Sequence, residues 1–163
     1  MNPEVAKWLL SLVTAIVAAF VGSTLALRKT KTERRWQAKY DAYQQILAAV
    51  EAMRYWAEEC YASNLLLPAV SGEKLSELSN RYQEAKRELW GYVHVGELII
   101  SSASRQLLEE VLVEIGRQEF RFEDDSVDDA EIPAALAHHC DDIRTAVAKA
   151  LPKLLQLARA DIG

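Results

Sequence analysis

The pattern of charged and apolar positions divides the chain into one uncharged stretch and four amphipathic segments. Trp8–Leu27 contains twenty residues and no formal charge. A helix of that length is about 30 Å long, which matches the hydrocarbon thickness of a bilayer. Because backbone polar groups in lipid must bond within the segment itself, the pattern predicts a single transmembrane helix.

Beyond this stretch, apolar residues recur at spacings of three and four, which is typical of helices with one buried face. The pattern predicts helices at about 32–63, at about 73–93, from Ser101 or Ser102 to about Glu119, and from near Pro133 onward. The expected buried positions are Trp36, Tyr40, Tyr43, Leu47, Val50, Met53, Ala57 and Tyr61 in the first helix, Leu75, Leu78, Tyr82, Ala85, Leu89 and Tyr92 in the second, Leu107, Leu108, Val111, Leu112 and Ile115 in the third, and Leu136, Cys140, Ile143, Val147, Ala150, Leu154 and Leu155 in the fourth. We therefore expect an all-α protein whose four helices pack as an antiparallel bundle.

Proline and serine mark the ends of these helices. Ser71 is placed to cap the second helix, and Pro133 suits the first turn of the last. Pro152 lacks an amide hydrogen, so we expect it to kink or divide the last helix. The expected domains are a transmembrane anchor at 1–27, a basic juxtamembrane segment at 28–40 and a cytosolic helical bundle at 41–163.

The net charge changes sign along the chain. Residues 28–40 carry a net charge of +5, whereas residues 41–163 carry −10. Phosphate binding needs a cationic surface, so the acidic bundle argues against nucleic acid as a partner. The positive-inside rule places the N-terminus outside and the bundle in the cytoplasm. The basic residues expected to meet anionic lipid headgroups are Arg28, Lys29, Lys31, Arg34 and Arg35.

A cleaved signal peptide is the alternative interpretation of the N-terminal stretch, with Thr24-Leu25-Ala26 as a weak cleavage site. The apolar run is longer than a signal peptide needs, and basic residues follow it directly, which favours an anchor. Cys60 and Cys140 are too few and too far apart for a disulfide framework, so we expect reduced, buried thiols.

Small residues line one face of the predicted span. They are Ser11, Ala15, Ala19 and Ser23 on one ridge, and Thr14, Ala18, Gly22 and Ala26 on the next. Small residues let helix backbones approach closely in lipid, so this face predicts a homo-oligomer. The alternative explanation is that Ala, Ser and Thr are simply common in membrane helices.

Two short motifs resemble a group of uncharacterised bacterial proteins. They are Trp36-x-x-Lys39-Tyr40-x-Ala42-Tyr43 and, at the end of a predicted helix, Gly96-Glu97-Leu98-Ile99-Ile100-Ser101. The likeness covers about residues 30–115. It implies a single N-terminal span in the bacterial inner membrane and a small helical cytosolic domain, and it brings no established activity.

Arg87 and His94 are separated by six residues, a spacing similar to the Arg-x(4–6)-His motif of HEPN-class helical ribonucleases. In such enzymes an Arg and a His from each of two chains act together on a phosphodiester. Glu88 directly follows the Arg here and is a poor neighbour for RNA phosphate. A solvent-exposed pairing of Arg87 with Glu84 is the simpler explanation.

His138 and Asp142 are metal-ligand types one turn apart, on either side of Cys140. Adjacent ligands on one helix diverge, and no HExxH or CxxC pattern supports a metal site. We therefore expect exposed His138 and Asp142 and an inward Cys140, and no cofactor is predicted. The acidic run at 123–131 lacks the spacing of a calcium loop and stabilises the next helix through its dipole, with docking of a basic partner as the alternative.

No motif assigns a reaction to this chain. The sequence predicts a membrane-anchored, self-associating helical module that binds a protein partner of unknown identity. A membrane-tethered effector with HEPN-like nuclease chemistry at Arg87 and His94 is the alternative.

Overall fold

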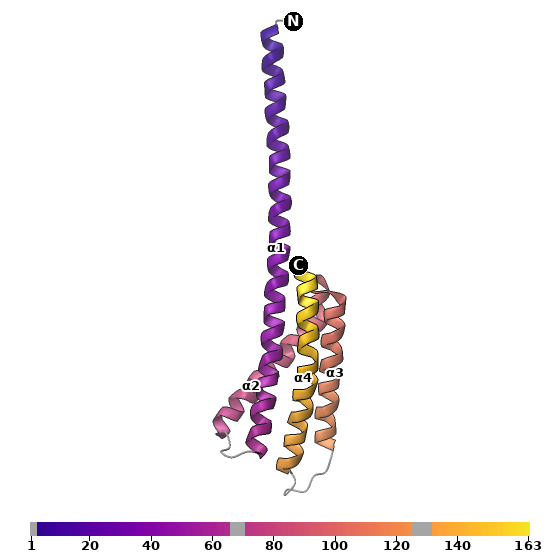
Figure 1. Ribbon diagram of the computed structural model, residues 1–163. Helices are drawn as coiled ribbons and strands as arrows, with labels where there is room; N and C mark the ends of the chain where they lie inside the picture. Colours follow the sequence, from indigo (N-terminus) through magenta and orange to yellow (C-terminus); the bar gives the residue numbers. More distant parts are fainter. Residues whose placement is uncertain (1–2, 66–70, 125–131) are drawn as a thin grey trace. The chain divides into compact units, whose positions relative to one another are not determined.

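The computed structural model describes residues 3–65, 71–124 and 132–163. Every regular element in these ranges is helical, which confirms the predicted all-α class. The elements are α1 (Pro3–Leu65), α2 (Gly72–Val95), the short 3-10 helix η1 (Gly96–Leu98), α3 (Ser102–Asp124) and α4 (Ile132–Ile162), as Figure 1 shows.

The chain forms two compact units, Met1–Ala38 and Lys39–Gly163, and α1 contributes residues to both. We call the second unit the bundle. Within it α3 packs against α2 and α4, and the buried residues of α1 join the same core. This is the predicted helical bundle.

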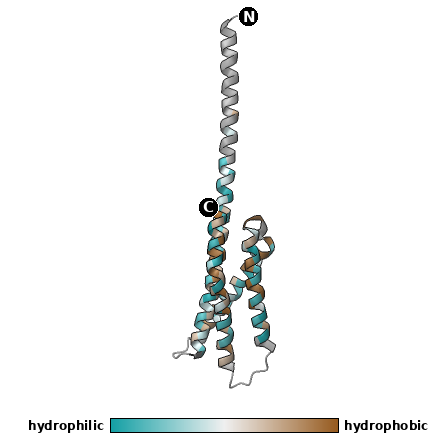
Figure 2. Cartoon of the chain, turned by 45° about the vertical axis from the view of Figure 1, so that its right-hand side comes forward, coloured by the Kyte–Doolittle hydropathy of each residue, from teal (hydrophilic) through white to brown (hydrophobic). Residues whose placement is uncertain are grey.

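The bundle core follows the predicted apolar faces. Figure 2 shows hydrophobic and hydrophilic residues sharing each helix of the bundle. The largest fully buried side chains are Tyr43, Ile46, Met53, Tyr82, Leu89, Leu108, Leu112, Ile115, Cys140, Ile143, Val147 and Leu154. All but Ile46 were expected at these positions, because a three- and four-residue repeat places them on one side of their helix.

Three of the expected buried positions are exposed. Trp36 and Tyr40 are 46% and 45% exposed, because the core of α1 begins only at Ala42 and Tyr43. Leu155 is 38% exposed, because its neighbour Leu154 occupies the buried face of α4. Adjacent residues on a helix point about 100° apart, so only one of the two reaches the core.

The predicted Ser71 cap is confirmed, and of the two candidates Ser101 and Ser102 it is Ser101 that caps α3. The Ser71 hydroxyl accepts a hydrogen bond from the Lys74 N–H at 3.4 Å, at the start of α2. The Ser101 hydroxyl accepts from the Ser104 N–H at 3.3 Å and thereby caps α3. Pro152 was expected to kink or divide the last helix, and it does not divide it, because α4 is one helix with an exposed Pro152 inside it.

In the part of the chain that the structure describes, no helix is both long and apolar enough to cross a membrane. Most side chains of Trp8–Leu27 lie outside that part, as does the Arg28 side chain. The small-residue face lies outside it too, except Ser23, whose exposed hydroxyl donates to the Phe20 carbonyl at 2.9 Å. Residues 125–131 of the acidic run are also outside it.

Neighbouring leucines of α4 give a matched test of the core. Leu154 is 1% exposed, whereas Leu155 is 38% exposed. Leu154→Ala should lower the free energy of unfolding by about 2–5 kcal/mol, because it removes buried methyl groups and leaves a cavity. Leu155→Ala should lower it by less than about 1 kcal/mol. Urea unfolding of the full chain, followed by circular dichroism, measures both, and equal losses would contradict the placement of α4.

Candidate functional site

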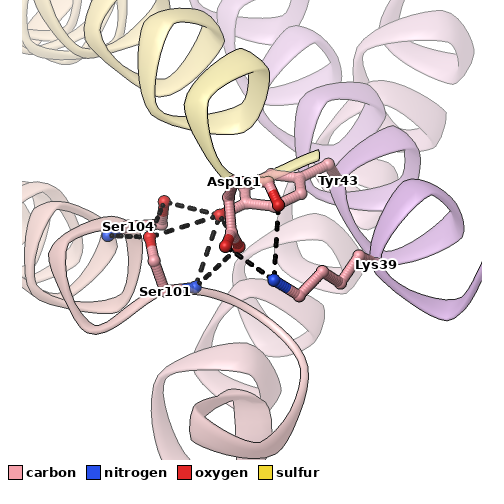
Figure 3. A network of polar contacts seen from close by, with 5 residues as sticks. All are labelled: Lys39, Tyr43, Ser101, Ser104 and Asp161. Atoms are coloured by element: carbon pink, nitrogen blue, oxygen red, sulfur yellow. Dashed lines mark hydrogen bonds and ion pairs between the residues drawn. The ribbon is translucent and has the colours of Figure 1, made fainter. Parts of the chain in front are cut away.

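The main polar cluster of the bundle lies where α1, α3 and α4 meet (Figure 3). Asp161 follows Leu154 and Ala158 at spacings of four and three, so its carboxylate lies on the buried face of α4. Lys39 and Tyr43 are four residues apart on one face of α1.

Ser101 and Ser104 complete the cluster from the first turn of α3. Together these five residues, Lys39, Tyr43, Ser101, Ser104 and Asp161, form what we call the Asp161 network.

Each oxygen of the Asp161 carboxylate has a donor from another element. Oδ1 accepts from Lys39 Nζ at 2.7 Å. Oδ2 accepts from the Tyr43 hydroxyl at 2.9 Å and from the Ser101 N–H at 3.0 Å. The carboxylate therefore joins α1, the start of α3 and α4 through three hydrogen bonds.

The hydroxyl groups of the network have only one consistent order of donation. Tyr43 gives its proton to Asp161, so the Ser104 hydroxyl, 2.7 Å away, must donate to the Tyr43 oxygen. The Ser101 hydroxyl, at 2.9 Å, must then donate to Ser104. Every hydroxyl is thus both donor and acceptor, and no serine proton is left over for catalysis.

Burial and hydrogen bonding act in opposite directions on Asp161. Burial disfavours the charged form and by itself would raise the pKa of Asp161. The hydrogen bonds from Lys39, Tyr43 and Ser101 outweigh it, so the pKa lies below its ordinary value. The carboxylate is therefore ionised at neutral pH, and its charge is balanced by Lys39.

A second polar cluster joins α2 and α3 around Glu119. The Tyr82 hydroxyl donates to Glu119 Oε1 at 2.8 Å, and Lys86 forms an ion pair with Oε2. Burial, then the hydrogen bond to Glu119, raises the pKa of Tyr82, so the phenol stays protonated. Trp56 of α1 stacks on the Tyr82 ring with centroids 4.2 Å apart.

Burial lowers the pKa of the half-buried His139 on α4, against the raising effect of nearby Glu119 and Asp142.

The structure gives Arg87 and His94 separate local contacts. Both are exposed on α2. Arg87 Nε donates to the Gln83 carbonyl at 3.3 Å, and the His94 ring stacks on Trp90 with centroids 5.5 Å apart. The geometry within one chain does not bring the two side chains to a common point.

The structure confirms the expected packing around Cys140. His138 and Asp142 are exposed, and Cys140 is fully buried. Among the described residues, no three His, Cys, Asp or Glu side chains form a group that could hold a metal ion. Cys60 and Cys140 are free and buried, as predicted. The interaction with Cys60, together with burial, raises the pKa of the Cys140 thiol.

A mostly apolar hollow of about 270 Å³ lies between α1, α2 and η1. It is lined by Gln45, Glu88, Gly91, Tyr92, Val95, Gly96 and Ile99. The Tyr92 hydroxyl donates to Gln45, and Glu88 supplies the only formal charge of the lining. An anionic lining of this kind does not suit a phosphodiester.

No protein-family model, curated protein or solved structure matches this chain. The function is therefore inferred from the residues themselves. The sequence pattern places Lys39 in the basic segment and Tyr43 in the core, and it offers Ser101 or Ser102 as a helix cap. It does not single out Ser104 or Asp161. The signal for Asp161 was its position on the apolar face of α4, where a charge needs partners.

The Asp161 network predicts a specific pH dependence of stability. Folding lowers the pKa of the Asp161 carboxyl. The ionised carboxylate therefore contributes fully to stability well above the pKa of the unfolded chain, about 3.9, and this contribution is lost as the pH falls through the pKa of the folded chain. Asp161→Asn keeps the shape but removes the charge that Lys39 balances. We expect a loss of about 1–3 kcal/mol of unfolding free energy at neutral pH.

Urea unfolding of both forms between neutral and strongly acidic pH measures this effect. The gap between the native chain and Asp161→Asn should narrow below about pH 4. Asp142→Asn removes an exposed carboxylate of the same helix and is the matched control. A gap that does not change with pH would show that the network is not held by the charge of Asp161.

Proposed function

We propose that this chain is a membrane-anchored helical interaction module. The observation that carries the proposal is the order of its N-terminal residues: twenty uncharged positions, Trp8–Leu27, followed at once by a basic cluster. Such a stretch is long enough to cross a bilayer as a helix, and cations directly after it favour retention on the cytoplasmic side.

The basic cluster supports contact with anionic headgroups. Lys29, Lys31, Arg34 and Arg35 are all exposed. Lys29 lies 3.9 Å from Glu33, and because both side chains are largely exposed this pair leaves the cation accessible to lipid phosphates. Each exposed cation next to an anionic surface contributes on the order of 1 kcal/mol. With the resemblance to bacterial single-span proteins, this supports the bacterial inner membrane as the location.

Binding is favoured over catalysis by the way the polar groups of the bundle are used. In the Asp161 network every carboxylate and hydroxyl oxygen already has a partner, and Glu119 accepts from both Tyr82 and Lys86. A general base must lie within hydrogen-bond reach of the proton that it removes from a substrate, whereas these oxygens accept hydrogen bonds from side chains of neighbouring helices. These clusters hold helices together, so the outer surface is left for a protein partner.

No observation favours the nuclease alternative. Arg87 bonds to its own helix, and the hollow beside Tyr92 has Glu88 in its lining. Residues 41–163 also carry a net charge of −10, which repels RNA phosphates.

Self-association is part of the proposal. The small-residue face of the predicted span allows two helices to approach closely, and anchoring confines all copies to one surface. Confinement raises the effective concentration of the bundles, so weak contacts between them become significant.

The first test is the orientation of the chain. Alkaline phosphatase fused after Gly163 should be inactive in a bacterial host, because the enzyme folds only when exported, whereas a fluorescent protein at the same site should be bright. The N-terminal positive-inside signal can be reversed as a control by moving the basic cluster ahead of the span. An active phosphatase on the native chain would refute the cytoplasmic placement of the bundle.

The second test is subunit number. Ala15→Ile, Ala19→Ile and Gly22→Ile together keep the span apolar and block close approach, so single-molecule photobleaching in bilayers should show more monomers. The matched control places the same residue type on the other side of the helix, as Val13→Ile, Val17→Ile and Val21→Ile. A monomeric native chain would refute self-association. Equal loss in both variants would refute a role for the small-residue face.

A further inference from the structure

The turn between α2 and α3 ends in an exposed apolar tip. Val95, Leu98 and Ile99 are 66%, 89% and 36% exposed. They lie next to one another around η1, and the apolar hollow beside Tyr92 continues their surface, since Val95 and Ile99 also line it. Exposed apolar residues that lie together on a surface usually meet a partner. We call Val95, Leu98 and Ile99 the apolar tip.

Backbone hydrogen bonds and the buried Ile100 side chain fix the turn that carries the apolar tip. Ile99 and Ile100 both donate their N–H to the Gly96 carbonyl at 2.8 Å, which closes the turn. Ile100 is buried, and a Cβ added at Gly96 would lie 3.2 Å from its side chain. The next residue, Ser101, donates its N–H to Asp161. Because the backbone on both sides of Leu98 is fixed, the Leu98 side chain cannot turn toward the core.

The tip lies at the end of the bundle where the chain arrives from the basic segment. Asp161 accepts from Lys39, the first residue of the bundle, and from Ser101, three residues after Leu98. Figure 1 shows the turn between α2 and α3 at the same end of the bundle as the C-terminal end of α4. The opposite end begins at Leu65, about 39 Å further along α1 at the rise of a helix.

The distance along the chain keeps this end of the bundle close to the predicted span. Leu27 and Lys39 are twelve residues apart, and α1 is helical between them, so the separation is at most about 18 Å. The headgroup layer that covers the hydrocarbon is itself several ångströms thick on each side. The proposed anchor therefore tethers the end that carries the tip within about this length of chain from the span.

We propose that the apolar tip inserts into the headgroup layer of the bilayer in which the N-terminal segment is anchored. This inference rests on the proposed membrane anchoring and adds a second contact with the same surface. An apolar turn at the interface binds lipid by its buried area, as interfacial helices do. The basic cluster at 28–35 lies between the span and the bundle and offsets the repulsion between anionic lipids and the acidic bundle.

The test places an environment-sensitive fluorophore on the tip of the full chain. Leu98→Cys is labelled with NBD after reconstitution into vesicles of phosphatidylcholine and phosphatidylglycerol. Leu98 is 89% exposed, so the substitution leaves the core intact, and the buried Cys60 and Cys140 should react slowly. Glu73→Cys, an exposed position in the first turn of α2, is the matched control, because it lies at the opposite end of that helix.

We expect blue-shifted NBD emission at position 98 and loss of that emission when the lipids carry a spin label near the headgroup. Position 73 should remain water-like and unquenched. Water-like emission at both positions, with the chain resistant to alkaline extraction, would overturn the insertion of the tip and leave the anchor standing. A blue shift at 98 without quenching by lipid would show that the tip packs against protein, which also overturns it. Release of the chain by alkaline extraction would refute the proposed function itself.

Discussion

The bundle depends on the burial of one negative charge. A carboxylate moved out of water costs several kcal/mol unless donors replace its hydration, and Asp161 receives three of them. The donors come from Lys39, Tyr43 and Ser101, so α1, α3 and α4 must all be in place before the charge is satisfied. These hydrogen bonds depend on the exact position of each helix more than apolar packing does. A helix shifted by one turn keeps most of its apolar contacts but leaves the carboxylate without partners. The Asp161 network therefore selects one packing from several of similar hydrophobic energy.

The helices and most of the core could be predicted from the sequence, because a helix has one period and the apolar residues follow it. The prediction failed at positions that fit the helical repeat but have no neighbouring helix to bury them. Trp36 and Tyr40 continue the repeat of α1, but the core ends below them and they stay exposed. Pro152 removes one backbone hydrogen bond without ending α4, since its exposed position leaves the freed carbonyl group open to water.

The polar clusters could not be predicted, because their members are far apart in the chain and each had a sufficient local explanation. Lys39 is separated from Asp161 by more than a hundred residues, and a lysine after a basic run suggests a lipid contact. Ser101 was found as a helix cap, but its second role, a backbone donor to Asp161, depends on where α4 ends. The candidate site residues that were chosen from motif spacing are all exposed on their helices. They are Arg87, His94, His138 and Asp142. Spacing alone is weak evidence of chemistry when the side chains do not converge.

Pro152 has a consequence for how α4 opens. The last turns of the helix, from Lys153 to Ile162, are joined to the rest across a position with no amide donor. Proteins open locally in cooperative segments as well as globally. Opening of this short segment would withdraw Asp161 and expose the Tyr43 hydroxyl while the remainder of α4 stays folded. The amides of Lys153–Ile162 should then exchange with solvent as one group and be less protected than those around Ile143. Their protection relative to the intrinsic exchange rate should fall further when Asp161 is protonated.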